Sequence, residues 1–330
     1  MTKNIMEKRY LLGVDTGSSK THAILSDRSG KVVGFGESGC GNYEIVGEQD
    51  FVIALQIAVN EAIKSAEIES KEIAAMGFGF CGYDWPSEKP IMDKAINSLG
   101  IHCPYQFVND VTLGLIAGSS AGWGIAVDAG TGNNVRGRDK SGKIGRITGN
   151  GIRFGEFGGA SELVWRGMMA VTYAWSTRGQ KTKMTQLFMK HTSVSSQDAL
   201  IEGLATGKIE LSSELAKEII QLAVEGDREA QKTVEFNASE LARNVNAVIR
   251  QLDFQNISFE VVLIGSVFKA GEVYLNPFKE TVCKFAPGAE FLHLSVPPVI
   301  GSILMAADLV GVQTQNFKNA LIKSIGNIKF

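Results

Sequence analysis

The sequence predicts an α/β protein of two lobes, and three observations lead to this fold class. Short apolar or alternating runs of strand length take turns with longer segments in which apolar residues recur at helical spacing. The order three strands, helix, strand, helix, strand, helix occurs twice along the chain. The length of 330 residues also suits two domains of about 150 residues each. Two stacked α/β lobes with a cleft between them would bury these elements.

The first repeat begins with an apolar run that ends in an acid, followed by an alternating run and a third strand after a turn. A helix is expected next, because apolar residues recur at helical spacing from Phe51 to Ala62. The expected elements are strands at 10–15, 20–26 and 31–35, a helix at 48–66, a strand at 73–80, a helix at 90–98, a strand at 105–108 and a helix from Asp110.

The second repeat follows the same order, with helices inserted after its third strand. Its expected elements are strands at 123–128, 133–138 and 143–148, helices at 158–173, at 183–191 and over a long stretch ending near 252, a strand at 259–264, a helix at 272–285, a strand at 291–294 and a helix from 298. The first lobe is expected to comprise residues 1–117 plus 313–330, and the second lobe residues 118–312. The tail at 315–329 has a weak helical pattern and is expected to fold back on the first lobe.

Composition excludes several classes of protein. Apolar residues make up 44% and charged residues 21%, and the net charge is −2 without a basic stripe, so no nucleic-acid partner is expected. The most apolar late segment, 296–312, is interrupted by Pro297, Pro298 and Asp308, and the N-terminus lacks the apolar stretch of a signal peptide. The four cysteines form no C-x-x-C pair. We therefore expect a cytoplasmic protein that does not bind membranes.

Three glycine-rich segments come directly after apolar strands, at 15–21, 128–134 and 264–267. Glycine lets backbone N–H groups approach a phosphate closely, and serine and threonine hydroxyls add donors. For any one of these segments a plain turn is about as good an explanation. Two matched loops at equivalent points of a repeated topology are harder to explain as turns. Two G-x-G-x-x-G matches, at 34–39 and 77–82, do not follow a first strand and open a helix, as a dinucleotide site requires.

These three loops resemble the phosphate-1, phosphate-2 and adenosine segments of the actin, sugar kinase and heat-shock-70 superfamily. More narrowly, the chain is similar to the N-acetylglucosamine kinase group of the BadF/BadG/BcrA/BcrD ATPase family. The resemblance covers nearly the whole chain and implies two actin-like (ribonuclease H-like) lobes with a duplicated βββαβαβα topology, an ATP cleft between them and a homodimer. It is carried by residues 13–25, Asn42, 82–86, 108–118, 127–136, 151–163, 262–271 and 298–307.

The resemblance also implies roles for individual residues. The β- and γ-phosphates of ATP would be held by Gly17, Ser18, Ser19, Lys20 and Thr21, the second phosphate loop would be Gly130, Thr131 and Gly132, and the loop beside adenosine would be Gly265, Ser266 and Val267. Asp15 would lie near Mg²⁺ and hold it through water. The sugar would contact Asn42, Asp110, Asn133 and Glu156, with Asp110 as the general base.

The residues around Asp110 support a site independently of the resemblance. Asp110 follows a short apolar strand and precedes an apolar helix, and ligands bind at such strand ends in open α/β sheets. The alternative role is that of a helix N-cap, for which Asp is favoured. The sequence leaves both roles equally open. Asp84 is more simply explained as part of a surface turn, and His22 as a structural residue within a strand.

Two departures from the kinase group fall in the predicted sugar-binding turn. The group often has an Asp-Glu pair there, whereas this chain has Glu156 followed by Phe157, and a sugar-facing Trp of some members would fall near Asn150. The group that reads the 2-substituent of the sugar is therefore expected to differ.

The sequence thus predicts an ATP-dependent kinase for an amino sugar, most simply N-acetylglucosamine at its 6-hydroxyl. An ATPase activator of the same family would need cysteine ligands for an iron–sulfur cluster, and none lies between Cys103 and Cys283. The sequence also leaves open an ATP-binding sugar sensor without kinase activity, and an actin-like filament protein.

Overall fold

The computed structural model describes residues 8–312, 314–326 and 328. Contacts divide the chain into two units, Met1–Gly124 with Leu292–Phe330, and Ile125–Phe291. Each unit contains one five-stranded sheet. The predicted boundary residue 313, the N-terminal residues 1–7 and residues 327 and 329 of the predicted tail lie outside the described residues.

The sheet of the first unit has the order β3-β2-β1-β4-β5. Its strands are β1 (Tyr10–Thr16), β2 (Thr21–Asp27), β3 (Val32–Ser38), β4 (Ile73–Phe80) and β5 (Tyr105–Asn109). The first three strands form an antiparallel meander, and β4 and β5 join β1 in parallel. The carboxyl ends of β1, β4 and β5 therefore meet at one edge of the sheet, where the predicted phosphate loop and Asp110 lie.

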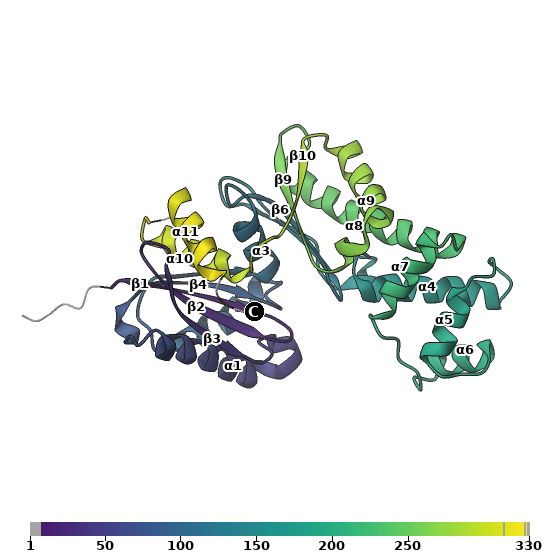
Figure 1. Cartoon of the computed structure of the whole chain (residues 1–330), viewed down its shortest axis with the longest axis horizontal. Coiled ribbons are helices and arrows are strands. Elements are labelled where there is room, and N and C mark those ends of the chain that lie inside the picture. Colours follow the sequence, from purple (N-terminus) through teal and green to yellow (C-terminus); the bar gives the residue numbers. More distant parts are fainter. Residues whose placement is uncertain (1–7, 313, 327, 329–330) are drawn as a thin grey trace, which may run out of the picture. The chain divides into compact units, whose positions relative to one another are not determined.

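Helices cover both faces of this sheet (Figure 1). Neighbouring residues of β1 point to opposite faces, as the period of two requires. Leu11 packs with α3 (Asp110–Gly118), α10 (Val299–Leu309) and α11 (Gln315–Ile325). Leu12 and Val14 pack with α1 (Tyr43–Ser65) and α2 (Lys89–Asn97) on the other face. The first unit is thus a three-layer α/β/α sandwich, and α11, from the predicted tail, packs in one of its helical layers.

Two glycines let α10 lie directly on the strands of the first unit. A Cβ at Gly13 in β1 would lie 2.3 Å from Ser302 Oγ, and a Cβ at Gly77 in β4 would lie 2.0 Å from the Ser302 carbonyl oxygen. Any larger residue would push the helix off the sheet, because real Cβ atoms do not come this close. The observed boundary therefore differs from the predicted one at 312/313, since the chain returns to the first unit at Leu292.

The sheet of the second unit has the order β10-β9-β6-β7-β8. Its strands are β6 (Gly124–Ala129), β7 (Asn133–Arg138), β8 (Ile144–Arg146), β9 (Phe259–Ile264) and β10 (Ala289–His293). Because β9 pairs in parallel with β6, and β7 pairs antiparallel with β8, the topology of the first sheet is repeated. The predicted duplication is confirmed in both sheets.

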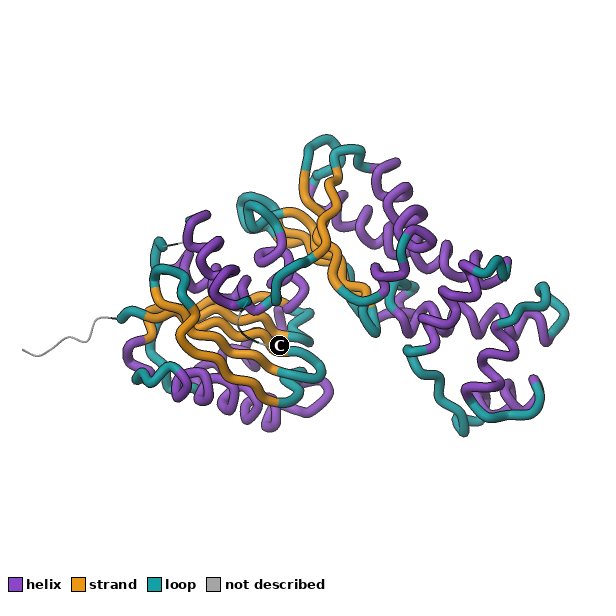
Figure 2. Tube along the Cα trace, in the orientation of Figure 1, coloured by secondary structure: helices purple, strands orange, loops and turns teal. Residues whose placement is uncertain are grey.

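The insertion between β8 and β9 is a block of helices and loops without strands (Figure 2). It contains α4 (Ala160–Trp175), α5 (Met184–His191), α6 (Gln197–Ala205), α7 (Leu215–Val224) and α8 (Arg228–Leu252), and α9 (Glu272–Phe285) follows β9. The long helical stretch predicted to end near residue 252 comprises α6, α7 and α8, with breaks after Ala205 and Val224, and it ends at Leu252. None of the described helices is long and apolar enough to cross a membrane.

The first helix begins earlier than its apolar pattern indicates. α1 starts at Tyr43 rather than near residue 48, because the Asn42 side chain caps it by accepting a hydrogen bond from the Glu44 N–H at 2.9 Å. Gly47 interrupts the helix with a φ of 79°, a conformation that glycine adopts readily. The apolar periodicity becomes regular only after this kink.

Candidate active site

The loop between β1 and β2 is held in shape by its own backbone. The Gly17 N–H donates to the Lys20 carbonyl at 2.8 Å, and the Gly17 carbonyl accepts from the Gly41 N–H at 2.9 Å. Thr21 is fully buried, and its hydroxyl donates to the Gly39 carbonyl at 3.0 Å. Ser18 and Ser19 are exposed at the tip of the loop. Thr21 therefore fixes the loop, while the serines remain available to a ligand.

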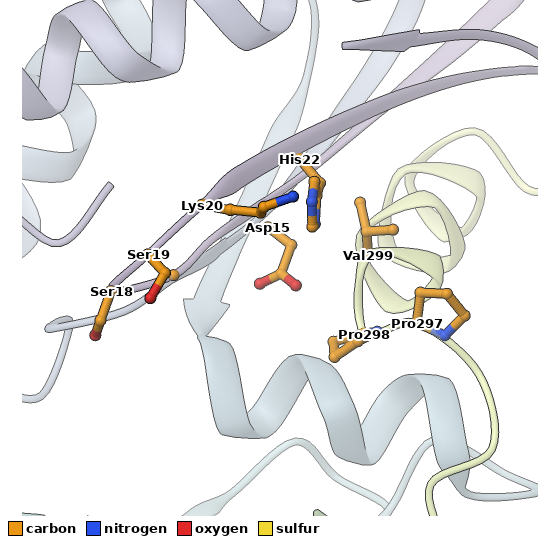
Figure 3. A pocket seen from close by; sticks show the side chains of 9 residues that line it. Asp15, Ser18, Ser19, Lys20, His22, Pro297, Pro298 and Val299 are labelled. Atoms are coloured by element: carbon orange, nitrogen blue, oxygen red, sulfur yellow. The ribbon is translucent and has the colours of Figure 1, made fainter. Parts of the chain in front are cut away.

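A pocket of about 480 Å³ opens beside this loop. Figure 3 shows the Asp15 carboxylate pointing into the space between the loop and the segment that begins α10. The lining residues are Asp15, Gly17, Ser18, Ser19, Lys20, His22, Pro297, Pro298 and Val299. The structure thus brings the predicted magnesium-proximal acid and most of the first phosphate loop around one pocket, and adds a wall from residues 297–299.

Asp15 supplies the carboxyl group among the residues that line this pocket. Burial, with a contribution from the nearby Asp110 carboxylate, raises the pKa of Asp15 to about 8. Two carboxylates that disfavour each other's charge attract a divalent cation. Among the described residues no three His, Cys, Asp or Glu side chains gather as a metal site. The carboxylates of Asp15 and Asp110 fit Mg²⁺, because this ion keeps most of its waters and needs few protein ligands.

Lys20 and His22 share one acceptor on the neighbouring strand. Lys20 Nζ lies 2.9 Å from Glu37, and His22 Nε2 lies 3.1 Å from Glu37 Oε2. The hydrogen bond from Lys20 is the main reason that the pKa of Glu37 lies below its ordinary value. His22 has a structural partner, as expected, yet it also lines the pocket.

Asp110 is the first residue of α3, at the carboxyl end of β5. The N-cap is Asn109, whose Oδ1 accepts the Val111 N–H at 3.0 Å, and Asp110 Oδ1 accepts the same N–H at 2.9 Å. The Asn109 amide donates to Asp84 Oδ1 at 3.2 Å. Asp84, expected in a surface turn, is therefore partly buried beside the start of α3.

Asn42 and Ser18 meet at Cys81, the residue that follows β4. Asn42 is 7% exposed, and its Nδ2 donates to Cys81 Sγ at 3.4 Å. Ser18 Oγ also lies 3.4 Å from this sulfur atom, and burial together with the charge of the nearby Asp110 carboxylate raises the pKa of the thiol. The structure thus brings together three residues predicted for different roles, through a cysteine that sequence reasoning did not single out. No spacing or motif in the sequence marks this cysteine.

The second phosphate loop in the second unit is joined to the start of α4. The carbonyls of Gly130 and Thr131 accept the N–H groups of Ala160 and Ser161 at 2.9 and 2.8 Å. The predicted adenosine loop lies against the same strand end, since a Cβ at Gly265 would be 2.3 Å from the Ala129 carbonyl oxygen. Only glycine permits this approach, and Gly265 also has a φ of 100°.

Both loops line a pocket of about 180 Å³ in the second unit. Its residues are Gly130, Thr131, Ala160, Ser213, Glu214, Ala216, Lys217, Ile220, Ser266 and Val267. Sequence reasoning missed the contribution of Ser213, Glu214 and Lys217 at the beginning of α7. These polar residues follow no strand, and only the folding of the helical insertion brings them beside the loops.

Asn133 and Glu156 adjoin each other in the second unit. Asn133 Nδ2 donates to the Glu156 carbonyl at 3.4 Å. The Glu156 residue is 8% exposed, and its carboxylate accepts the N–H and hydroxyl of Thr148, both at 2.9 Å, and the Asn150 N–H at 3.0 Å. The carboxylate is thus fixed in place by its own loop. Phe157 turns toward Phe236, with ring centroids 5.1 Å apart.

Two sugar kinases of known name are similar to this chain over nearly its whole length. The chain is 25% identical over 301 residues to the N-acetylmuramic acid/N-acetylglucosamine kinase of Clostridium acetobutylicum, covering 90% of this chain and 98% of that protein. It is 25% identical over 319 residues to the N-acetyl-D-glucosamine kinase of Dictyostelium discoideum, covering 91% and 98%.

The fold is shared with solved structures of low sequence identity. The ROK hexokinase of Thermus thermophilus superposes with a TM-score of 0.59 at 17% identity, covering 92% of this chain and 99% of that one. The sequence profile of one family matches residues 12–306, which include both pockets and all of both sheets except the first two residues of β1. This match, together with the loops and the duplicated topology, shows that the chain belongs to the BadF/BadG/BcrA/BcrD ATPase family.

Proposed function

We propose that this protein is an ATP-dependent kinase that phosphorylates an amino sugar, with N-acetylglucosamine as the first candidate and its 6-hydroxyl as the acceptor. The observation that carries the proposal is the grouping of Asp15, Ser18, Asn42 and Asp110 around the strand ends of the first unit. A phosphate loop, an acid for a hydrated cation, an amide and a second carboxylate are what phosphoryl transfer to a hydroxyl needs. The names of the two full-length relatives support this sugar class.

Each unit is proposed to contribute loops to nucleotide binding. In the first unit, the hydroxyls of Ser18 and Ser19 and the Lys20 ammonium would bind the β- and γ-phosphates. In the second unit, Gly130 and Thr131 would contact phosphate. Ser266, Val267 and the start of α7 would contact the adenosine. Mg²⁺ held near Asp15 through water would neutralise charge on the phosphates.

Asp110 is proposed to act as the general base. The sugar hydroxyl oxygen attacks the γ-phosphorus, the bond from that phosphorus to the ADP oxygen breaks, and the hydroxyl proton passes to the Asp110 carboxylate and then to solvent. The backbone N–H of Val111 keeps one carboxylate oxygen in place, so that the base is oriented before substrate arrives. Asn42 would hold a sugar hydroxyl beside it.

Substrate choice is proposed to depend on the loop that contains Glu156. Its carboxylate already accepts three donors from Thr148 and Asn150, so it presents a fixed acceptor rather than a mobile one. Asn133 adjoins this loop and would contact the same sugar. Because Phe157 replaces the second acid of the kinase group and packs on Phe236, the 2-substituent would meet fewer charged groups here.

The test is a sugar panel with purified protein and Mg-ATP. N-acetylglucosamine, glucosamine, N-acetylmannosamine, N-acetylmuramic acid and glucose are compared by ADP release and by mass spectrometry of the product. We expect one amino sugar to stimulate ADP release and to yield a matching phosphosugar. ATP hydrolysis that ignores every sugar would favour an ATPase activator, and sugar binding without turnover would favour a sensor. A cytoplasmic location, a homodimeric state and independence of nucleic acid stay predictions from the sequence.

A further inference from the structure

The Glu37 carboxylate on β3 contacts two side chains that line the pocket beside the first phosphate loop. Lys20 Nζ lies 2.9 Å from each of its two oxygen atoms. His22 Nε2 lies 3.1 Å from Glu37 Oε2. Lys20 and His22 are lining residues of the pocket, whereas Glu37 is not. The carboxylate therefore stands behind this wall and joins its two basic side chains.

The sheet keeps this carboxylate in place. His22 and Glu37 are directly paired across β2 and β3, so their side chains share one face of the sheet. The His22 ring also packs on Phe35, with ring centroids 5.9 Å apart, and its side chain is 18% exposed. The Glu37 N–H donates to the Glu61 carboxylate of α1 at 3.2 Å. Strand pairing and a packed histidine thus hold Glu37 more firmly than an exposed side chain is usually held.

Lys20 is a side chain that needs such an anchor. It precedes β2, and its side chain is 53% exposed. A lysine ammonium stands on a flexible four-carbon stem, and ordering this stem costs free energy when a ligand binds. In Figure 3 the Lys20 side chain extends toward the His22 ring. The ammonium has three donors and the two Glu37 oxygens take two at most, so one donor can face a phosphate in the pocket.

The ion pair acts on the placement of Lys20 rather than on the stability of the fold. Both side chains are partly exposed, and pairs of this kind contribute little to the free energy of unfolding. The hydrogen bond from Lys20 holds the pKa of Glu37 below its ordinary value, so the carboxylate keeps its charge at neutral pH.

We propose that Glu37 is a positioning residue of the nucleotide site, which holds the Lys20 ammonium in the orientation that meets the phosphates. This inference rests on the proposed function, in which Lys20 binds the β- and γ-phosphates. A lysine ordered before the ligand arrives loses less conformational entropy on binding. Charge alone has the opposite effect, because a carboxylate near the pocket repels phosphate. Positioning and simple repulsion therefore predict opposite changes when the Glu37 charge is removed.

The first experiment measures binding of the non-hydrolysable analogue Mg-AMPPNP by calorimetry. Glu37→Gln keeps the size of the side chain and removes its charge, and we expect the dissociation constant to rise about 3- to 10-fold. Glu48→Gln removes the acid of another exposed ion pair, 3.2 Å from Lys94 and outside the pocket, and should bind as wild type. The thermal unfolding midpoints of both variants should stay within about 2 °C of wild type.

A double-mutant cycle shows whether the effect of Glu37 passes through Lys20. Lys20→Met removes the ammonium and keeps most of the stem. In this background Glu37→Gln should change the dissociation constant less than about 2-fold, because no ammonium is left to be placed. An equal loss of affinity with and without Lys20 would contradict the proposal.

The sign of the change in Glu37→Gln decides between the two explanations. Tighter binding of Mg-AMPPNP would overturn the proposal, because the carboxylate would then repel phosphate or compete with it for Lys20. Unchanged binding would overturn it as well. With the sugar that the panel identifies, the KM for ATP should rise by the same factor as the dissociation constant, with kcat within about 2-fold of wild type.

These measurements separate failure of the inference from failure of the proposed function. Sugar-dependent turnover by wild type, with unchanged Mg-AMPPNP binding in Glu37→Gln, would reject the positioning role alone. Weaker binding in Glu37→Gln, with no sugar-dependent ADP release by wild type, would count against the kinase alone. A wild-type protein that does not bind Mg-AMPPNP would reject both.

Discussion

The Asp110 carboxylate begins α3 but does not cap it. The sequence left the roles of cap and base equally open, and the structure gives the cap to Asn109. Asp110 then stands in the first turn, where the helix N-terminus favours a negative charge. Its neighbours Cys81 and Asp15 come from the ends of two other strands. Asp110 is thus placed where a base is needed, and its catalytic role stays a proposal.

Replacing this carboxylate gives the sharpest test of the mechanism. For Asp110→Asn we expect kcat to fall about 10²- to 10⁴-fold, because an amide cannot take the hydroxyl proton. The dissociation constant for ATP, measured by calorimetry, should stay within about 2-fold. Asp50→Asn, on an exposed turn of α1, is the matched control. Near-full turnover in Asp110→Asn would show that the base is another group.

The raised pKa of Asp15 predicts a pH dependence of stability in magnesium-free buffer. Below about pH 4 the carboxyl is protonated in both states, whereas between about pH 4 and 8 only the unfolded chain ionises it. The folded state then binds more protons, so stability falls as the pH rises through this window. Above pH 8 the carboxyl group is ionised in both states, and the folded state remains destabilised by the full free-energy cost of enclosing the charged carboxylate.

Asp15→Asn should remove this penalty. The free energy of unfolding of the variant minus that of wild type should be about 2 kcal/mol larger at pH 9 than at pH 4. This gain is smaller than for a fully enclosed carboxyl group, because Asp15 keeps some contact with solvent. Urea unfolding at both pH values with EDTA present measures it. A difference between the two proteins that does not change with pH would contradict the assignment.

At the scale of elements, α7 contributes to the second-unit pocket although no motif precedes it. Ser213, Glu214 and Lys217 stand about 80 residues from the second phosphate loop and about 50 from the adenosine loop. A pattern of residues along the chain identifies loops after strands, but it does not report which inserted helix packs beside them. One wall of this pocket is therefore formed by the start of α7, and only the packing of α4, α7 and α8 places it there.

Lys217 on this wall should contribute to nucleotide binding. We expect Lys217→Ala to raise the KM for ATP about 3- to 10-fold with kcat nearly unchanged, because a cation is removed from beside an anionic ligand. Lys208→Ala, an exposed lysine outside the pocket, is the control. Equal KM values for both variants would exclude Lys217 from the nucleotide site.

At the scale of the whole molecule, each unit closes its own core around its own sheet, and the two sheets have the same topology. The last helix of the second repeat is the exception, since α10 lies on β1 and β4 of the first unit. Gly13 and Gly77 leave the space that α10 needs to lie on these two strands. The duplication therefore applies to the strand order, whereas the helices are distributed differently between the two units.

Ligand binding should stabilise the folded chain as a whole. Mg-ADP at 100 times its dissociation constant should add about 2.7 kcal/mol to the free energy of unfolding, because only the folded state binds it. Calorimetric melts with increasing Mg-ADP measure the shift, and Lys217→Ala should need more ligand for the same shift. A melt that does not respond to Mg-ADP would argue against a nucleotide site.

Local patterns in the sequence were enough to predict the two α/β repeats and the three loops after strands. Strand period, helix period and the position of glycine are local properties, and they agree with the sheets and loop positions that the structure shows. The family resemblance followed from the same loops and is confirmed by the match over residues 12–306.

Packing in three dimensions was needed to show that α10 lies on the first sheet, that α7 lines the second pocket, and that Asn109 rather than Asp110 caps α3. It also brought Cys81 into contact with Ser18 and Asn42, close enough to Asp110 for the charge of that carboxylate to act on the thiol. These four residues lie on four separate segments, and no two of them are neighbours in the sequence. Such contacts depend on side-chain packing between distant segments, which no local periodicity encodes.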